Sequence, residues 1–155
     1  MNTNTSEFPY LHGFSEVEQA RLIKQAQIAE STIFHDIEYS GARRLLEVGS
    51  GVGAQTEILL RRFPQLHATC VDLSVAQLGA AAHRLGGMPW LADRYLLQQA
   101  DATDLPFEPR NFDAAFLCWV LEHVPSPARV LSEVRRVLAP GSPVYVTEVM
   151  NASFL

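Results

Sequence analysis

The sequence has few of the features that mark nucleic-acid-binding or membrane proteins. Its 155 residues include 12 Lys and Arg against 17 Asp and Glu, for a formal net charge of −5. The basic residues form no stripe that could follow a phosphate backbone, so no nucleic acid partner is expected. No apolar run reaches the roughly 20 residues of a membrane span, and MNTNTSEFPY lacks the basic start and apolar core of a signal peptide. We therefore expect no membrane partner and a cytoplasmic location.

Cysteine is also scarce. Cys70 and Cys118 each lie inside an apolar run, without the spacing of a metal knuckle or a redox pair. Such cysteines are usually buried thiols in a reducing compartment. Glu122 and His123 are neighbours in sequence and rarely converge on one ion, so no metal site is predicted.

What the sequence does contain is an alternation of short apolar runs with longer, helix-like ones. Apolar residues make up 48% of the chain and charged residues 19%, which is typical of a single globular domain. The apolar runs predict strands within residues 43–49, 67–74, 94–101, 112–120 and 142–150. Helical spacing and capping residues predict helices within residues 15–31, 54–63, 74–85 and 127–138.

Strands that alternate with helices favour a parallel sheet with helices on both faces, the doubly wound, Rossmann-like α/β fold. Ligands bind such sheets at the carboxyl ends of the strands. The one natural boundary falls at Tyr39–Gly41, so residues 1–40 are interpreted as an N-terminal helical segment and residues 41–155 as the core.

The stretch LLEVGSGVGAQT places three glycines directly after the first predicted strand. Gly49, Gly51 and Gly53 allow a tight turn and a close approach of a ligand to the backbone. Asp72 follows the next strand, about 20 residues further on, where a carboxylate can accept hydrogen bonds from a ribose diol. An adenosine-containing ligand is therefore expected.

Two kinds of ligand fit this loop. Gly49, Gly51 and Ala54 also satisfy the dinucleotide fingerprint G-x-G-x-x-A, which leaves an NAD-dependent oxidoreductase open. The carboxylate of Glu47, just before the loop, would repel a pyrophosphate and suit a ligand that carries an ammonium group.

The motifs LLEVGSGVG, VDLS, QADATDLPF and FDAAFLCWVLEHVPSPARVLSEVRRVLAPGSPVYVTE occur in this order between Ala42 and Glu148. In this series the chain resembles the class I S-adenosylmethionine-dependent methyltransferases, within the small-molecule group related to the ubiquinone and menaquinone biosynthesis enzymes. The resemblance implies S-adenosylmethionine as the cofactor, S-adenosylhomocysteine as its product, and a small-molecule acceptor.

The resemblance also implies roles for individual residues. The backbone of Gly49, Ser50 and Gly51 would border the methionine part, and Glu47 would favour its amino group. Gly53, in the same loop, is also counted among the cofactor-binding residues. Asp72 would bind the ribose hydroxyls, and Leu73 would lie against the adenine face. Asp101 would accept from the adenine amino group, and the Ala102 amide would meet a ring nitrogen. The sulfonium end would be lined by Cys118 and Trp119, whose aromatic face can attract a cation.

Three further residues have competing interpretations. His123, in LEHVP, is the candidate general base. The competing interpretation is a loop histidine that is hydrogen-bonded to the backbone. Tyr10 and His12 precede the first helix, where the family often folds a segment over the cofactor, so they are candidate lid residues. The alternative is a tail that packs on the surface. Asp101 has an alternative in an Asx-turn before Asp104.

The chain departs from the family pattern after the fifth strand. The family's sheet has seven strands, and the last two have no counterpart here, so the expected strand order is 3-2-1-4-5. The fifth strand then becomes an apolar edge, which favours a homodimer in which this strand or the NASFL segment covers the same edge on another copy. A fragment of a longer enzyme is the other explanation.

Three functions follow from these observations. The leading one is methyl transfer from S-adenosylmethionine to a small-molecule acceptor. The alternatives are a non-catalytic cofactor-binding or interaction module, and an NAD-dependent oxidoreductase that rests only on GSGVGA and Asp72.

Overall fold

A parallel sheet forms the centre of the molecule. The computed structural model describes residues 15–149, and in this part five strands pair in the order β3-β2-β1-β4-β5. All four pairings are parallel. The strands are β1 (Arg44–Val48), β2 (His67–Asp72), β3 (Tyr95–Gln99), β4 (Ala114–Cys118) and β5 (Val144–Thr147). The predicted fold class and strand order are confirmed.

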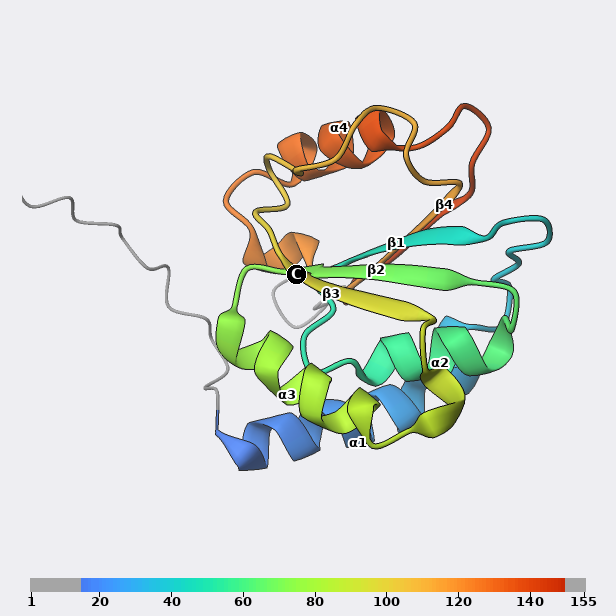
Figure 1. Cartoon of the computed structure of the whole chain (residues 1–155). Coiled ribbons are helices and arrows are strands. Elements are labelled where there is room, and N and C mark those ends of the chain that lie inside the picture. Colours follow the sequence, from blue (N-terminus) through green and yellow to red (C-terminus); the bar gives the residue numbers. More distant parts are fainter. Residues whose placement is uncertain (1–14, 150–155) are drawn as a thin grey trace, which may run out of the picture.

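Helices cover both faces of this sheet. They are α1 (Glu16–Ile33), α2 (Ala54–Arg62), α3 (Val75–Gly86) and α4 (Pro127–Val137), with two 3-10 turns that were not predicted, η1 (Pro89–Leu91) and η2 (Leu121–His123). Figure 1 shows α2, α3 and α1 on one side of the strands and α4 on the other. Each predicted helix is present and lies within two residues of its expected bounds.

The alternation of side chains along β1 explains the two cores. Leu45 is buried among residues of α1, α2 and α3, whereas Leu46 and Val48 are buried among residues of α4. Successive residues of a strand point to opposite faces, so Glu47 shares the face of Leu45, beneath α2. This parity decides which residues of the strand end can meet one another.

The helix starts use side-chain caps where the sequence predicts them. Ser15 Oγ accepts the N–H of Glu18 at 3.3 Å, and Ser74 Oγ accepts the N–H of Gln77 at 3.3 Å. The second cap fixes α3 directly after the end of β2. The loop between β2 and α3, which carries Asp72, is therefore held at its helical end.

The described part of the N-terminal segment packs on the core. The Phe34 ring stacks on Phe116 of β4 with centroids 5.4 Å apart, and the Tyr39 hydroxyl donates to Ala115 O at 3.0 Å. The boundary at residue 40 and the lid interpretation stay predictions, because Tyr10 and His12 lie outside the described residues.

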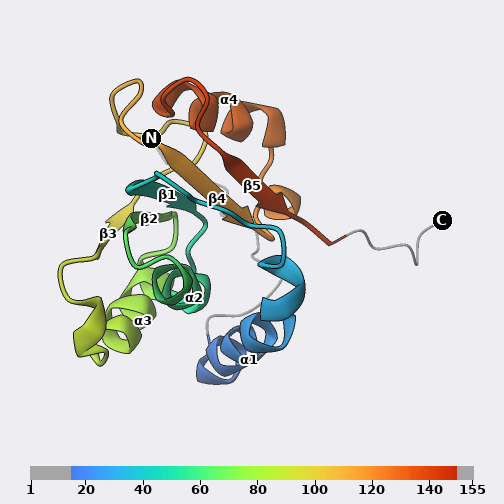
Figure 2. The same cartoon turned by 90° about the vertical axis from the view of Figure 1, so that its right-hand side faces the viewer.

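Strand β5 lies at one edge of the sheet. Within residues 15–149 its only strand partner is β4, as Figure 2 shows. Val144 and Val146 are 41% and 42% exposed. In the same part of the chain, no helix combines the length and the apolar character needed to cross a membrane.

Candidate functional site

The glycine loop closes over the end of β2. The amides of Gly49 and Ser50 donate to Val71 O at 2.8 and 3.1 Å, and the amide of Gly51 donates to Asp72 Oδ2 at 2.8 Å. The amide of Gly53 donates to Ser50 O at 3.0 Å. These four N–H groups have protein partners, so the loop offers a ligand its α-carbons and carbonyl groups rather than these donors.

Glycine is required in this loop for conformation and for space. Gly49, Gly51 and Gly53 have φ angles of +71°, +53° and +75°, in the left-handed region that other residues rarely adopt. A Cβ on Gly49 would lie 2.5 Å from Cγ2 of Val120. A Cβ on Gly51 would meet no atom within 4 Å, so Gly51 borders open space at the carboxyl ends of the strands.

Asp72 ties the loop to the start of α3. Its Oδ2 accepts the Gly51 amide and its Oδ1 accepts the Ser74 amide at 2.9 Å. Burial raises the pKa of this carboxyl, and the backbone hydrogen bonds oppose the rise. A carboxylate has about four acceptor sites, so capacity remains on Asp72 for a ligand hydroxyl.

Glu47 lies beneath α2, and its exposed fraction is 2%. Oε2 accepts the Thr56 hydroxyl at 2.6 Å, and the same hydroxyl lies 3.7 Å from Cys70 Sγ. Burial raises the pKa of Glu47 to about 7, with a smaller contribution from the Asp72 carboxylate, against the lowering effect of the Thr56 and Cys70 hydrogen bonds. The predicted open carboxylate in the crevice is thus a buried, hydrogen-bonded one, and its role toward an ammonium group stays a prediction.

Two buried polar atoms beside the loop have no hydrogen-bond partner among the described residues: Ser50 Oγ and Gln55 Oε1. The other side of the Gln55 amide is fixed, because Nε2 lies 3.6 Å from Cys118 Sγ. Buried polar atoms are normally paired, so these two are suited to accept groups of a ligand. Sequence reasoning missed Gln55, although its position one residue into α2, directly after the glycine loop, was a usable signal.

Trp119 follows β4 in a strained conformation. Its φ is +57°, which is rare for a bulky residue, and its amide donates to Thr147 O of β5 at 2.8 Å. The next two amides, of Val120 and Leu121, donate to Glu148 Oε1 at 3.0 and 2.8 Å. Strain of this kind persists where the surroundings impose it and is enriched at functional sites.

His123 lies in η2, on the same connection. Its Nε2 is 3.5 Å from Glu122 Oε1 and its side chain is 18% exposed. Its backbone amide donates to Val120 O at 3.0 Å. Its role as a general base stays a prediction.

The adenosine side of the predicted site is formed by the ends of β2 and β3. Asp101 Oδ1 accepts the amide and the hydroxyl of Thr103 at 2.8 and 2.7 Å, the predicted alternative turn. That turn leaves acceptor capacity on the carboxylate, so it does not exclude a bond to an adenine amino group. Leu73 is 67% exposed and Ala102 is half-buried. The ligand contacts assigned to these residues stay predictions.

A surface hollow of about 580 Å³ lies elsewhere, between the end of α4 and the start of β5. Its lining includes Arg110, Leu131, Arg135 and Val144, and none of the predicted site residues. Chemistry and fold both favour the carboxyl edge of the sheet, so this hollow is not the candidate site.

Comparison with known proteins identifies the family. Residues 46–146 match the family described as "Methyltransferase domain". The chain belongs to the methyltransferase domain family. Over 105 residues this methyltransferase domain is 34% identical to the demethylmenaquinone methyltransferase of Clavibacter sepedonicus, which covers 68% of the chain and 40% of that protein.

Two solved structures share the fold of this methyltransferase domain. Phosphoethanolamine N-methyltransferase 2 of Haemonchus contortus, solved in complex with S-adenosyl-L-methionine, is 26% identical with a TM-score of 0.67, over 84% of this chain and 30% of that one. The [4+2]-cyclase SpnF is 33% identical with a TM-score of 0.62, over 88% of this chain and 50% of that one. The chain spans between 29% and 42% of the length of the first curated relatives.

The contrast between two loop glycines gives a first test. Gly49→Ala must hold alanine at positive φ and displace Val120, and we expect it to lower the free energy of unfolding by about 2 to 4 kcal/mol. Gly51→Ala carries only the conformational strain, about 1 to 2 kcal/mol. Urea denaturation followed by circular dichroism measures both, and equal losses would contradict the assigned difference in space.

Glu47 gives a second test through pH. Its pKa is about 7 in the folded protein against an ordinary value of 4.5, so the folded state holds a proton that the unfolded state releases. This contribution to stability is fully present below pH 4.5 and is lost as pH rises through 7. Between pH 5 and pH 8, wild type should lose on the order of 2 kcal/mol more unfolding free energy than Glu47→Gln.

The measurement is urea denaturation of both proteins at the two pH values. Glu16→Gln, on the exposed first turn of α1, controls for the removal of one charge and should follow the wild-type profile. Parallel profiles for wild type and Glu47→Gln would refute the protonation assigned to Glu47.

Proposed function

We propose that this chain binds S-adenosylmethionine at the carboxyl edge of its sheet and transfers the methyl group to a small-molecule acceptor. The observation that carries the proposal is the combination of the open space at Gly51 with Asp72 and Asp101 at neighbouring strand ends. Membership of the methyltransferase domain family supports it, and so does the S-adenosyl-L-methionine named with the Haemonchus contortus enzyme.

The loop chemistry favours this cofactor over a dinucleotide. The amides of Gly49, Ser50, Gly51 and Gly53 are engaged within the protein and are not free for a pyrophosphate. The unpaired acceptor at Gln55 Oε1 suits an ammonium donor, and the Ser50 hydroxyl can either donate a hydrogen bond to a ligand or accept one from it. Together with the buried Glu47 carboxyl, these groups fit the methionine part of the cofactor.

The residues of the chain supply position rather than proton chemistry. S-adenosylmethionine carries an electrophilic methyl group on a sulfonium, which a nucleophile takes with release of S-adenosylhomocysteine. Asp72 would hold the ribose diol, Asp101 and Ala102 the adenine, and Trp119 with Cys118 the sulfonium end. Holding two reactants in line and away from water is itself a large part of catalysis. His123 would take a proton only from an acceptor that needs to lose one.

Support for a small-molecule acceptor comes from the names of similar proteins. One is named for demethylmenaquinone and another for phosphoethanolamine, which differ in size and charge. The proposal therefore extends to the class of small molecules and names no single acceptor.

A second function is favoured by one observation. SpnF has this fold and is 33% identical, yet it is named a [4+2]-cyclase rather than a methyltransferase. A chain of this fold can therefore serve in a role other than methyl transfer. Binding of S-adenosylhomocysteine without its production from S-adenosylmethionine, across oxygen, nitrogen and carbon nucleophiles, would favour a cofactor-binding module.

Calorimetric titration tests the cofactor. We expect S-adenosylhomocysteine to bind the purified chain and NAD to give no binding heat. Asp72→Asn should weaken S-adenosylhomocysteine about tenfold or more, because a charged acceptor for the ribose is lost. Absence of S-adenosylhomocysteine binding to the wild type, or binding of NAD in its place, would contradict the proposal.

Asp113 offers a matched control. Its Oδ1 also accepts two backbone amides, those of Arg43 and Arg44 at 2.9 and 2.7 Å, but at the amino end of β1. Asp113→Asn therefore removes the charge from another amide-accepting carboxylate far from the site. Its affinity for S-adenosylhomocysteine should equal that of the wild type.

We also propose that the β5 edge forms a homodimer. Its support is the exposure of Val144 and Val146 on a strand with one neighbour in the described part of the sheet. Light scattering should give twice the mass of one chain for the wild type and the mass of one chain for Val146→Lys. A monodisperse wild-type monomer at high concentration would refute the dimer. The NASFL segment, predicted as an alternative cover for the edge, lies outside the described residues.

A further inference from the structure

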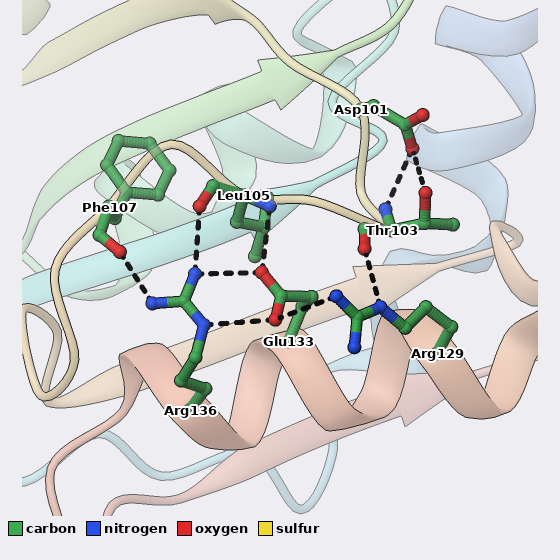
Figure 3. A network of polar contacts seen from close by, with 7 residues as sticks. All are labelled: Asp101, Thr103, Leu105, Phe107, Arg129, Glu133 and Arg136. Atoms are coloured by element: carbon green, nitrogen blue, oxygen red, sulfur yellow. Dashed lines mark hydrogen bonds and ion pairs between the residues drawn. The ribbon is translucent and has the colours of Figure 1, made fainter.

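Helix α4 presents three charged side chains to the loop that follows β3. Arg129, Glu133 and Arg136 lie on successive turns of the helix and all face residues 103–107, as Figure 3 shows. Spacings of four and three residues place side chains on one face of a helix. The loop crosses this face on its way from β3 to β4.

Glu133 is the centre of this contact. The residue is only 4% exposed, and Oε2 accepts the Leu105 amide at 2.9 Å and Arg136 Nη2 at 2.8 Å. Oε1 accepts Arg136 Nε at 3.0 Å and lies 3.8 Å from Arg129 Nη2. The hydrogen bonds from Arg136 lower the pKa of this carboxyl, which keeps it ionised at neutral pH.

The two arginines bind carbonyl groups of alternate loop residues. Arg136 donates to Leu105 O at 2.8 Å and to Phe107 O at 2.7 Å, and Arg129 donates to Thr103 O at 2.9 Å. Main-chain groups of this irregular loop have no strand partner, and α4 supplies hydrogen bonds to the Leu105 amide and to the carbonyl groups of Thr103, Leu105 and Phe107. The path of the loop from residue 103 to residue 107 is thereby defined by α4.

This loop begins with the proposed adenine contacts. Thr103, held by Arg129, donates its amide and its hydroxyl to Asp101 Oδ1 at 2.8 and 2.7 Å. The direction of the Asp101 carboxylate thus depends on where Thr103 lies. A continuous series of contacts runs from α4 through the loop to the carboxylate that would accept the adenine amino group.

The helix is a rigid support for this series. The neighbouring face of the helix places Val130, Val134 and Val137 in the core, with exposed fractions of 0%, 1% and 0%. The Leu105 side chain is buried in the same core. Binding groups held by residues on regular elements lose less entropy when a ligand arrives than groups on a free loop.

We infer that Glu133 is a positioning residue for cofactor binding, which acts with Arg129 and Arg136 to hold residues 103–107 so that Asp101 meets the adenine amino group. The inference rests on the proposed function. Glu133 itself touches no cofactor in this scheme, and its effect reaches the ligand only through Thr103 and Asp101.

Glu133→Gln tests this role by removing the charge while keeping the size of the side chain. We expect about tenfold weaker binding of S-adenosylhomocysteine. For S-inosylhomocysteine, in which an oxygen replaces the adenine amino group, the loss of affinity should be only about twofold. The reason is that this ligand has no amino group to donate a hydrogen bond to Asp101. Without ligand, the amides of Thr103, Asp104, Leu105 and Phe107 should exchange hydrogen faster in the variant, and those of β1 should exchange as in the wild type.

Glu30→Gln is the matched control. Glu30 of α1 also binds two arginines, Arg61 at 2.7 Å and Arg62 at 3.4 Å, on the face of the molecule away from α4. Its affinity for both ligands should equal that of the wild type. Arg129→Ala is a second variant that keeps the core contacts, since its side chain is 55% exposed, and it should weaken S-adenosylhomocysteine about threefold through Thr103 alone.

The outcomes separate the two claims. If the wild type fails to bind S-adenosylhomocysteine, the proposed function fails and this role fails with it. If the wild type binds and Glu133→Gln binds equally well, or loses equal affinity for both ligands, the positioning role alone is overturned. Should Glu133→Gln not fold, an unchanged affinity in Arg129→Ala overturns it in the same way.

Discussion

Carboxylates that accept backbone N–H groups hold the loops at the carboxyl edge of this sheet. Asp72 accepts the amides of Gly51 and Ser74, Glu133 that of Leu105, and Glu148 those of Val120 and Leu121. Chain segments between a strand and a helix have no ladder to pair their amides, and burying an unpaired amide is unfavourable. Apart from the local bond between Asp72 and Ser74, the loops that form the candidate site are therefore placed by acidic residues 21 to 28 residues away in the sequence.

This use of acidic residues bears on how the sequence predicts a site. Asp72 was assigned to a ligand from its place at a strand end and Asp101 from the family resemblance, and both also accept protein amides. One role does not exclude the other, since a carboxylate has more acceptor sites than the protein fills here. For Glu47 the structure differs more, because strand parity turns its side chain under α2 and against Thr56. Position in the sequence predicted the strand end correctly but not the depth of the side chain.

The fold was predictable because its signals are local. Apolar runs, Ser15 and Ser74 as caps, and the three loop glycines each depend on neighbours within a few residues. The parts that were not predicted depend on distant contacts. Leu105 and Glu133 are 28 residues apart, and Gln55 and Cys118 are 63 apart, so no periodicity relates them. The turn η2 likewise depends on a distant contact, because the amides of Val120 and Leu121 at its start donate to Glu148, which follows β5.

The two faces of the sheet carry different parts of the site. On the α2 face, the buried Glu47 and Thr56 lie under the glycine loop, near the unpaired Ser50 and Gln55 atoms. On the α4 face, Glu133 sets the loop that carries Asp101. A ligand that spans the carboxyl edge must therefore fit groups fixed by two separate cores. Because each core is rigid, the distance between the two groups of contacts is set by the sheet itself, and small differences in ligand length should be poorly tolerated.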